Sequence, residues 1–353
     1  MSGQSLFRSI ALGQAGVWSS PIRGLLRAFE PLYGAGVAVR NRYYDRRGPG
    51  VRIPVPVISI GNLTVGGTGK TPFVIDLVRR LEAMSLSPVV VARGYHAADA
   101  APNDEERLIR KRCPSVGYVA NPDRAAAALA AHRTLGADVI VLDDGFQHRR
   151  LARDLDIVLV DATHPFGSDH LLPRGLLREP ITSLRRADVI VLTRSDQVAP
   201  AQLPRLEARL RAANHDALLL QCVHRVDGIV RLDGRPLEAT LDGTRVVLFA
   251  GIGNPDAFAA TVSALGAQVV ESCWWSDHHR YTRRDVDRLA ATGRFPPHDW
   301  LVTTEKDGVK LAALEGLDHL PLAVVCVSIA FRGDAVDSFD DLLLRTAKQG
   351  ATG

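Results

Sequence analysis

Residues 64–71 read Thr-Val-Gly-Gly-Thr-Gly-Lys-Thr and stand between a β-branched run and a helical pattern. The run at residues 55–60 predicts a buried strand, and the apolar spacing over residues 71–83 predicts a helix. A glycine-rich loop between them directs backbone N–H groups at phosphate oxygens. Thr64 stands where the usual pattern has glycine, yet the context still predicts a phosphate-binding loop. The chain is thereby restricted to α/β folds in which a strand leads directly into a helix.

The loop residues have separate expected roles. Gly66, Gly67 and Gly69 let backbone amides converge on the phosphates. Lys70 is expected to reach the β- and γ-phosphates, and the Thr71 hydroxyl is expected to ligate Mg²⁺. The residues predicted to contact the nucleotide are Thr64, Val65, Gly66, Gly67, Thr68, Gly69, Lys70 and Thr71.

A second buried strand, at residues 139–142, ends in Asp143 and Asp144. In P-loop enzymes an acid at this position holds the magnesium ion, directly or through water. Either aspartate can also cap a turn before Gly145. The pattern therefore predicts a metal site at Thr71, Asp143 and Asp144, and it does not choose between the two acids.

The remaining pattern of the first 221 residues favours a mostly parallel sheet with helices on both faces, as in P-loop NTPases. Continuous β-branched runs alternate with helical segments, which is typical of strands that are buried on both sides. An alanine-rich helix is expected at residues 123–135. The further expected strands are Pro88–Ala92, residues 157–161 and Val189–Thr193.

The pattern changes near residue 222, where we expect a domain boundary between residues 1–221 and 222–353. Short segments at 222–226 and 228–232 precede Asp233-Gly234, which suggests a hairpin-like connection. A smaller second α/β domain is expected beyond it. Its expected strands are residues 246–250, 268–271, 300–303 and 323–327.

Residues 20–43 begin with Ser-Pro and carry apolar residues at helical spacing, which predicts a helix. Pro31 is expected to kink or split it. Several arginines decorate the helix, as in helices that lie at a membrane interface. Packing against the chain's own domain explains the pattern equally well, so both interpretations stay open.

Composition gives weaker constraints. The formal net charge of +4, from 43 basic and 39 acidic residues, does not identify a partner. The four cysteines form no CxxC pair, so we expect neither a disulfide framework nor a thiolate zinc site. No apolar run reaches the about 20 residues of a spanning helix, and no secretory signal is expected. Nucleic-acid binding is not expected, because no aromatic and basic platform is visible.

The predicted nucleotide and metal sites indicate a phosphotransferase. Such an enzyme also needs a base near the attacking hydroxyl. Candidates are the acids of the run at residues 103–106 and the adjacent His278 and His279. Such runs are more often solvated loops. The run Thr-Arg-Ser-Asp at 193–196 faintly resembles a guanine-reading element, but it is expected to be a strand-end loop near the nucleotide.

In several long motifs the chain resembles the tetraacyldisaccharide 4'-kinases of lipid A synthesis. The resemblance covers nearly the whole chain, and the family form of the loop also has threonine at position 64. The matching motifs are residues 61–72, Arg93-Gly94-Tyr95, residues 143–149, Asp161-Ala162-Thr163, Pro165-Phe166-Gly167, Leu172-Pro173, Arg178-Glu179-Pro180, Asp277-His278 and Thr304-Glu305-Lys306-Asp307.

The resemblance implies a Mg²⁺- and ATP-dependent transfer of the γ-phosphate to the 4'-hydroxyl of a tetraacylated glucosamine disaccharide 1-phosphate, giving lipid IVA. It implies a peripheral location at the cytoplasmic face of the inner membrane. The family base and its assisting histidine fall on Asp104 and His278, beside Lys70 as the third catalytic residue. Asn103 and Glu106 depart from the family's GDEP-like segment, which weakens the assignment of Asp104.

Two further expectations complete the sequence-based account. Four residues near the same sheet edge are candidates to bind the acceptor's phosphate or sugars, and each is equally readable as an ordinary surface residue. They are Arg93, Arg124, His148 and Arg149. The alternative function is a P-loop nucleotide switch or metallochaperone-like NTPase without a lipid acceptor, in which Asp104 and His278 have no role.

Overall fold

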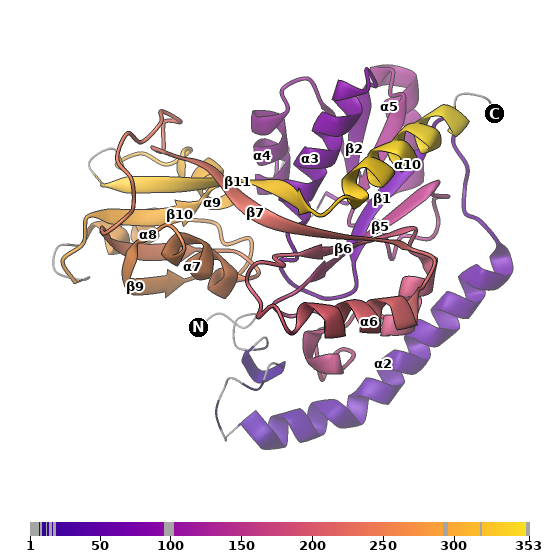
Figure 1. Cartoon of the computed structure of the whole chain (residues 1–353), viewed down its shortest axis with the longest axis horizontal. Coiled ribbons are helices and arrows are strands. Elements are labelled where there is room, and N and C mark those ends of the chain that lie inside the picture. The colour runs from indigo at the N-terminus through magenta and orange to yellow at the C-terminus, as the bar shows by residue number, and fades with distance from the viewer. Residues whose placement is uncertain are drawn as a thin grey trace. The chain divides into compact units, whose positions relative to one another are not determined.

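The computed structural model describes residues 19–94, 102–291, 296–317 and 320–350, together with positions 7, 9–11, 13 and 16. Tyr95 of the Arg-Gly-Tyr motif lies outside the described residues. The chain forms two compact units (Figure 1). The larger combines Arg8–Val223 with Ile329–Gly353, and the smaller contains His224–Ser328.

The larger unit is built on a parallel sheet, as the sequence predicted, and β1 lies at its centre. The strand order is β3-β2-β4-β1-β5-β6-β7, and each neighbouring pair is parallel. The strands are β1 (Val57–Asn62), β2 (Pro88–Ala92), β3 (Gly117–Ala120), β4 (Val139–Asp143), β5 (Leu155–Asp161), β6 (Val189–Thr193) and the first part of β7 (Leu218–Val230).

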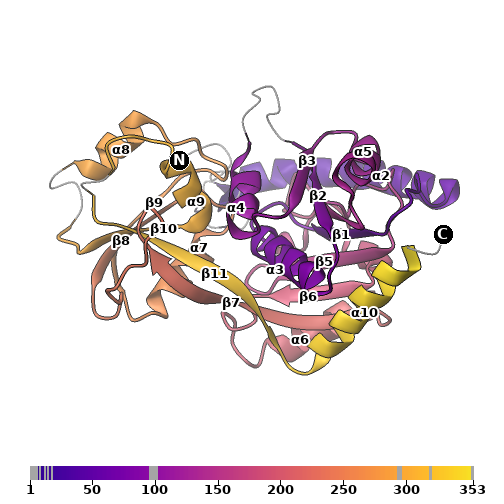
Figure 2. The same ribbon diagram turned by 90° about the horizontal axis from the view of Figure 1, so that it is seen from above.

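Helices cover both faces of this sheet because successive strand residues point to opposite sides. On one face, Val89, Val91 and Ile140 pack against the alanines of α5 (Arg124–Leu135). Figure 2 shows α3 (Lys70–Ala83) and α10 (Ala335–Gly350) on the other side. The other elements of this unit are α4 (Asp104–Arg112), η1 (Gly167–Asp169), η2 (Ile181–Arg186) and α6 (Leu203–Ala213).

The N-terminal segment forms a single helix, α2 (Ser19–Arg47), of 29 residues. The helix continues through Pro31, so the expected split does not occur. The Ser19 hydroxyl donates to the Gly16 carbonyl at 2.7 Å, and Pro21 follows in the first turn. Proline is tolerated where neighbouring contacts hold the helix, and α2 makes several such contacts on both sides of Pro31.

In the smaller unit the strand order is β11-β10-β8-β9, each strand is parallel to its neighbours, and these strands continue the sheet order beyond β7. Its apolar core includes Val246, Leu248 and Val302. The elements are β8 (Arg245–Ala250), β9 (Gln268–Trp274), β10 (Trp300–Thr304), β11 (Leu322–Arg332), α7 (Pro255–Ser263), α8 (Arg283–Ala290) and α9 (Glu305–Leu311).

Two details differ from the sequence-based expectation. The segments 222–226 and 228–232 are not separate strands, because β7 runs unbroken to Val230. An antiparallel bridge from Val230 to Pro236 and backbone hydrogen bonds close the turn at Asp233-Gly234. The C-terminal residues Ile329–Gly353 join the larger unit, whereas the expected domain boundary assigned them to the smaller one. The reason is that α10 packs on α3, where the Phe73 and Phe339 ring centroids lie 6.3 Å apart.

No helix among the described residues is both long and apolar enough to cross a bilayer.

Candidate active site

The phosphate-binding loop joins the end of β1 to the start of α3. Gly66 has φ +127° and Gly69 has φ +86°, values that an L side chain rarely adopts, so both positions favour glycine. A small pocket lies beside the loop. It is also lined by the last residue of β5 and by the segment before Arg178. Its lining residues are Thr64, Val65, Gly66, Gly67, Thr68, Asp161, His164 and Leu176.

The loop is held from behind by the end of β6. The Thr193 hydroxyl donates to the Thr68 carbonyl at 3.0 Å, and Arg194 Nη1 donates to the Gly67 carbonyl at 3.0 Å. Arg194 also forms a buried ion pair with Asp161. The run at 193–196 is therefore a strand-end loop beside the phosphate-binding loop, as expected. The supporting role of Arg194 was missed, because sequence assigns no partner to a strand-end arginine.

Lys70 lies within a network of charged and polar groups at the end of β4. Its Nζ is 3.2 Å from Asn62 Oδ1 and 3.6 Å from Asp144 Oδ1. Arg178 Nη1 lies 2.9 Å from both carboxylate oxygens of Asp144. Burial alone would raise the pKa of Asp144, but Lys70, Arg178 and Arg124 hold it well below its usual range. Asp144 is therefore ionised and already occupied by cations.

Asp143 has the opposite environment. It is 6% exposed, and its Oδ1 has no hydrogen-bond partner among the described residues. Burial, then the charge of Glu105, raise the pKa of Asp143 to about 7, while Lys70 opposes the shift. A buried carboxylate oxygen without a partner is a position that a divalent cation can satisfy. Of the two aspartates, Asp143 is thus the one whose environment fits a metal ligand.

The acids of the 103–106 run lie at the start of α4. Asn103 caps this helix by accepting from the Glu106 amide at 2.7 Å, and Asp104 Oδ1 accepts from the Glu105 amide at 3.1 Å. The influence of Glu105 on the pKa of Asp143 indicates that this first helical turn lies close to the end of β4. Sequence reasoning counted Glu105 among the candidate acids of this run but did not foresee its effect on Asp143.

The two adjacent histidines of the smaller unit differ sharply. His279 Nε2 is 3.1 Å from Asp285 Oδ2, and its ring stacks on Trp275 with centroids 5.6 Å apart. His278 has φ +59° and a half-exposed side chain whose Nε2 is 3.4 Å from Lys306 Nζ. His279 therefore has a packing role, whereas His278 lies beside Asp277 and Lys306.

Comparison with known proteins decides the family. The family model described as Tetraacyldisaccharide-1-P 4'-kinase matches residues 22–347. The chain belongs to this kinase family. A Tetraacyldisaccharide 4'-kinase of Syntrophus aciditrophicus is 39% identical, over 94% of this chain and 95% of the relative. One from Anaeromyxobacter dehalogenans is 42% identical, over 81% of this chain and 80% of the relative.

A solved structure of the same family agrees. LpxK from Aquifex aeolicus in complex with ATP is 29% identical and matches with a TM-score of 0.70, covering 92% of this chain and 99% of that one. The mostly parallel P-loop fold and the assignment as an ATP-dependent kinase are thereby confirmed. The alternative of a nucleotide switch or metallochaperone without a lipid acceptor is not favoured, because the kinase family match covers residues 22–347.

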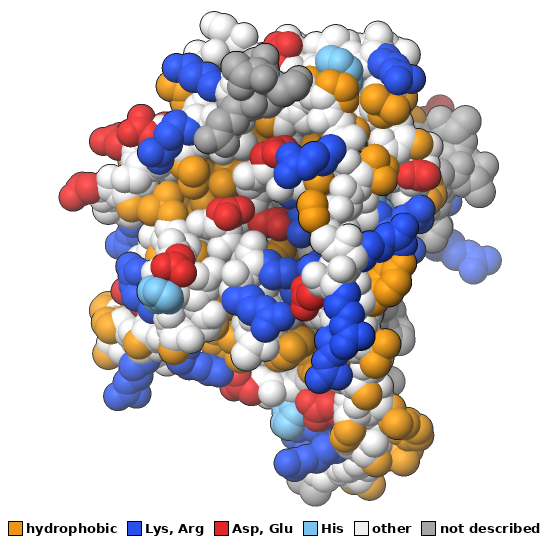
Figure 3. Space-filling view, turned by 90° about the vertical axis from the view of Figure 1, so that its right-hand side faces the viewer, with side chains coloured by type: hydrophobic (Ala, Val, Ile, Leu, Met, Phe, Trp, Pro, Cys, Tyr) orange, Lys and Arg blue, Asp and Glu red, His pale blue; other side chains and the backbone are white. Residues whose placement is uncertain are grey.

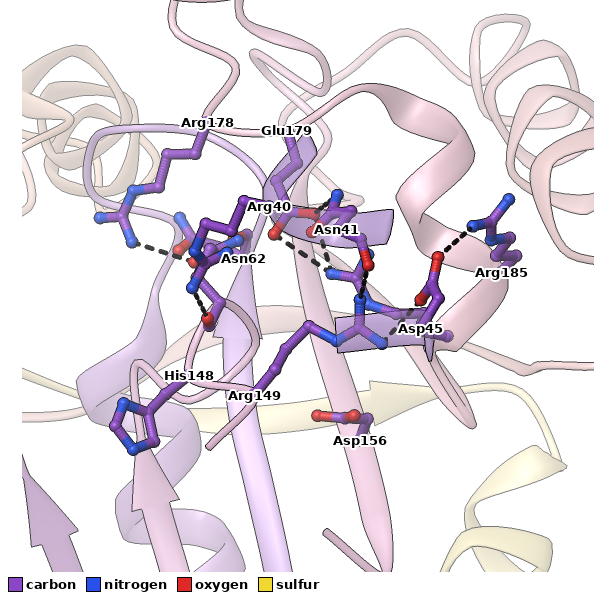
Figure 4. Close-up of polar contacts among 12 residues, drawn as sticks. Arg40, Asn41, Asp45, Asn62, His148, Arg149, Asp156, Arg178, Glu179 and Arg185 are labelled. Carbon is purple, nitrogen blue, oxygen red and sulfur yellow. Dashed lines mark hydrogen bonds and ion pairs between the residues drawn. The ribbon is translucent and has the colours of Figure 1, made fainter. Parts of the chain in front are cut away.

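Within this kinase, the four residues expected to bind the acceptor's phosphate or sugars have different surroundings. Arg124 is buried, and its Nη1 donates to the Asp144 carbonyl at 2.8 Å. Burial and neighbouring arginines lower the pKa of His148 to about 4, so it is neutral at pH 7. Arg93 is exposed at the end of β2. Arg149 is engaged by α2, since its Nη2 lies 2.7 Å from Asp45 Oδ1 (Figure 4).

Proposed function

We propose that this kinase transfers the γ-phosphate of ATP to the 4'-hydroxyl of a tetraacyldisaccharide 1-phosphate, giving lipid IVA. The observation that carries the proposal is the meeting of the phosphate-binding loop, Lys70 and the Asp143-Asp144 strand end in a member of this family. The loop amides and Lys70 bind the β- and γ-phosphates. Because the transition state of phosphoryl transfer is loose, positioning and charge supply most of the catalysis.

Mg²⁺ is proposed as the cofactor, which Thr71 and Asp143 would hold beside the nucleotide phosphates. Magnesium typically takes only one or two protein carboxylates at a nucleotide site. The bound ion supplies charge that neutralises the phosphates. The orphaned Oδ1 of Asp143 supports this choice over the cation-paired Asp144.

The acceptor hydroxyl is activated by Asp104, with His278 of the smaller unit assisting. Asp104 takes the proton as the 4'-oxygen bonds to the γ-phosphorus and ADP leaves. Support comes from the position of Asp104 in the first turn of α4, whose neighbour Glu105 acts on Asp143. Support for His278 over His279 comes from the contact of His279 with Asp285.

The acylated acceptor lies in a membrane, and we propose that α2 docks peripherally on the cytoplasmic face of the inner membrane. Side chains at intervals of three, four or seven residues form an apolar stripe along α2, each at least 38% exposed. Figure 3 shows hydrophobic side chains beside basic ones on the lowest part of the molecule, which Figure 1 shows to be formed by α2. The stripe consists of Ile22, Leu25, Phe29, Leu32, Val39 and Tyr43.

The function is tested with ATP labelled in the γ-phosphate and the acylated disaccharide 1-phosphate as acceptor. We expect label in the lipid with the wild-type chain and none above background with Lys70→Ala. Asp104→Ala should also abolish lipid labelling while leaving ATP binding largely intact, because a base is not needed for binding. Slow phosphate release without lipid labelling would refute the kinase proposal. Near-wild-type activity of Asp104→Ala would refute its role as the base.

A further inference from the structure

Besides its exposed apolar stripe, α2 has a polar face that contacts the rest of the larger unit. Glu30 Oε1 accepts from the Leu171 amide at 2.8 Å, and its carboxylate pairs with His170 Nδ1 at 2.9 Å. The Tyr33 hydroxyl donates to the Arg178 carbonyl at 3.0 Å. These residues recur at helical spacing on one side of α2, and their partners all lie between positions 170 and 178.

The segment that α2 contacts is the one that frames the phosphate-binding loop. The Val65 amide donates to the Leu176 carbonyl at 2.8 Å, and the Arg178 amide donates to the Leu63 carbonyl at 2.7 Å. Between them Thr64 and Leu177 form an antiparallel bridge. The side chain of Arg178 then reaches Asp144, so the backbone that Tyr33 holds carries the arginine that neutralises Asp144.

Asn41 makes a second contact with this segment. Its Nδ2 donates to Glu179 Oε2 at 2.8 Å, and Arg186 Nη2 lies 3.0 Å from the same oxygen (Figure 4). Glu179 is 1% exposed. A buried carboxylate needs its hydrogen bonds, so loss of the Asn41 amide removes one of them and leaves Arg186 to hold Glu179. Glu179 directly follows Arg178 in the chain.

A third contact reaches the loop after β4. Arg40 donates to the Gln147 carbonyl, and Arg149 Nη1 donates to the Asn41 carbonyl at 3.2 Å. Gln147 Nε2 in turn donates to the Asn62 carbonyl at 3.1 Å, next to the Asn62 side chain that contacts Lys70. The polar face of α2 thus contacts Arg178 directly and is linked to Lys70 through Gln147 and Asn62.

We propose that α2 is part of the nucleotide site as a positioning element, in which Tyr33 and Asn41 hold the Arg178-Glu179 backbone so that Arg178 stays on Asp144. Loss of either contact lets Arg178 withdraw, which leaves the charge of Asp144 to compete with the phosphates for Lys70. The inference rests on the proposed role of Lys70 and Asp144 in binding the nucleotide. It is independent of any contact of α2 with a membrane.

The test uses the full-length kinase in detergent micelles that present the acylated acceptor, so that membrane docking is not limiting. For Tyr33→Phe and Asn41→Ala we expect the KM for ATP to rise about three- to tenfold, the range that one lost hydrogen bond produces. The KM for the acceptor should stay within about twofold. Tyr33→Phe removes only one oxygen, so it remains informative if Asn41→Ala folds poorly.

The controls separate positioning from loss of folded protein. Ala35→Ser, an exposed substitution on the same helix, should leave the KM for ATP unchanged. In a double-mutant cycle, Tyr33→Phe should have little further effect in an Arg178→Ala background. A fall in activity with an unchanged KM for ATP, or full additivity in the cycle, would overturn the inference. An unchanged ATP affinity of Lys70→Ala would instead refute the site assignment on which it rests.

Discussion

At the scale of single residues, identical side chains acquire different chemistry from their neighbours. Asp143 and Asp144 are adjacent in sequence, yet burial and Glu105 raise the pKa of one while Lys70 and Arg178 lower the pKa of the other. His278 and His279 differ in the same way, because Asp285 and Trp275 hold only the second. Neither difference in environment is visible in the sequence, which left Asp143 and Asp144 undecided and favoured His278 over His279 only through the family's Asp-His motif.

The raised pKa of Asp143 predicts a pH dependence of stability. Its ordinary pKa is 3.8 and its folded pKa is about 7, so the folded state binds the extra proton between these values. Stability contributed by this group is therefore complete below about pH 4 and is lost as the pH rises through 7. In metal-free buffer, Asp143→Asn should be more stable than wild type at pH 8, by at least about 1 kcal/mol, one pKa unit's worth.

Urea unfolding at pH 5 and pH 8 measures this difference. The gap between Asp143→Asn and wild type should widen with pH. Asp144→Asn serves as the contrasting variant, because the pKa of Asp144 is lowered and its ion pair should be lost, so this substitution should destabilise the protein at pH 8. Equal responses of the two variants to pH would contradict the assigned environments.

Gly61, the residue before the end of β1, gives a second prediction at this scale. A Cβ added there would lie 2.5 Å from Phe146 Cβ and 2.7 Å from the Phe146 amide nitrogen. Gly61→Ala should therefore lower the free energy of unfolding by about 1–3 kcal/mol, as overpacking does. Gly36→Ala on α2 meets no atom within 4 Å and should stabilise the helix by up to about 1 kcal/mol. Thermal melting of both variants checks the contrast.

At the scale of elements, α2 shows how two faces of one helix serve different contacts. The polar face from Glu30 to Asp45 contacts the larger unit, while the stripe that includes Leu25 and Leu32 remains 61% and 70% exposed. The sequence offered docking on a membrane or packing on the chain's own domain as alternatives. Packing on the larger unit is observed, and because it uses one side only, it leaves the other available.

The exposed stripe predicts the strength of membrane association. Leu32→Ser should weaken binding to anionic lipid vesicles by about tenfold, because burial of a leucine side chain contributes about 1.5–3 kcal/mol. Wild-type binding should weaken with added salt, as expected for arginines near lipid phosphates. Vesicle co-sedimentation is the measurement, with Ala35→Ser, which removes no large apolar side chain from the same helix, as the matched control. Wild-type protein that stays in the supernatant at low salt would contradict peripheral docking through α2.

At the scale of the whole molecule, β7 and β11 each contain residues of both units. The chain after β11 forms α10, which belongs to the larger unit. Arg80 of α3 forms an ion pair with Asp340 at 2.7 Å and lies 4.8 Å from the Phe331 ring centroid. Phe339 is fully buried beside Phe73. The C-terminal helix is therefore structurally a part of the P-loop unit.

Removal of this contact should destabilise the P-loop unit itself. Phe339→Ala deletes a fully buried ring and should cost about 3–5 kcal/mol of unfolding free energy. Unfolding is monitored through the loss of the stabilisation that bound ATP gives, because this signal reports on the P-loop unit. Leu344→Ala, at a 38% exposed position of the same helix, is the milder control. An unchanged unfolding midpoint of Phe339→Ala would indicate that α10 does not stabilise this unit.

The sequence by itself determined the type and order of the main elements and the family. The bounds of β2 and β6 were predicted to the residue, because β-branched runs of this length report a strand buried on both faces. The phosphate-binding loop was predicted equally well, since its glycines, Lys70 and Thr71 lie in one contiguous motif. Local patterns of this kind need no knowledge of distant segments.

Only the tertiary structure decided which distant residues meet. The ion pair of Arg178 with Asp144 joins positions 34 apart, and the bond from Arg194 to Gly67 spans 127 positions. Which face of α2 packs inward, and to which unit α10 belongs, depend on contacts of this kind. The periodicity of a sequence predicts the local structure of a segment. The environment of a side chain such as Asp143 depends on distant groups that only the folded chain brings together.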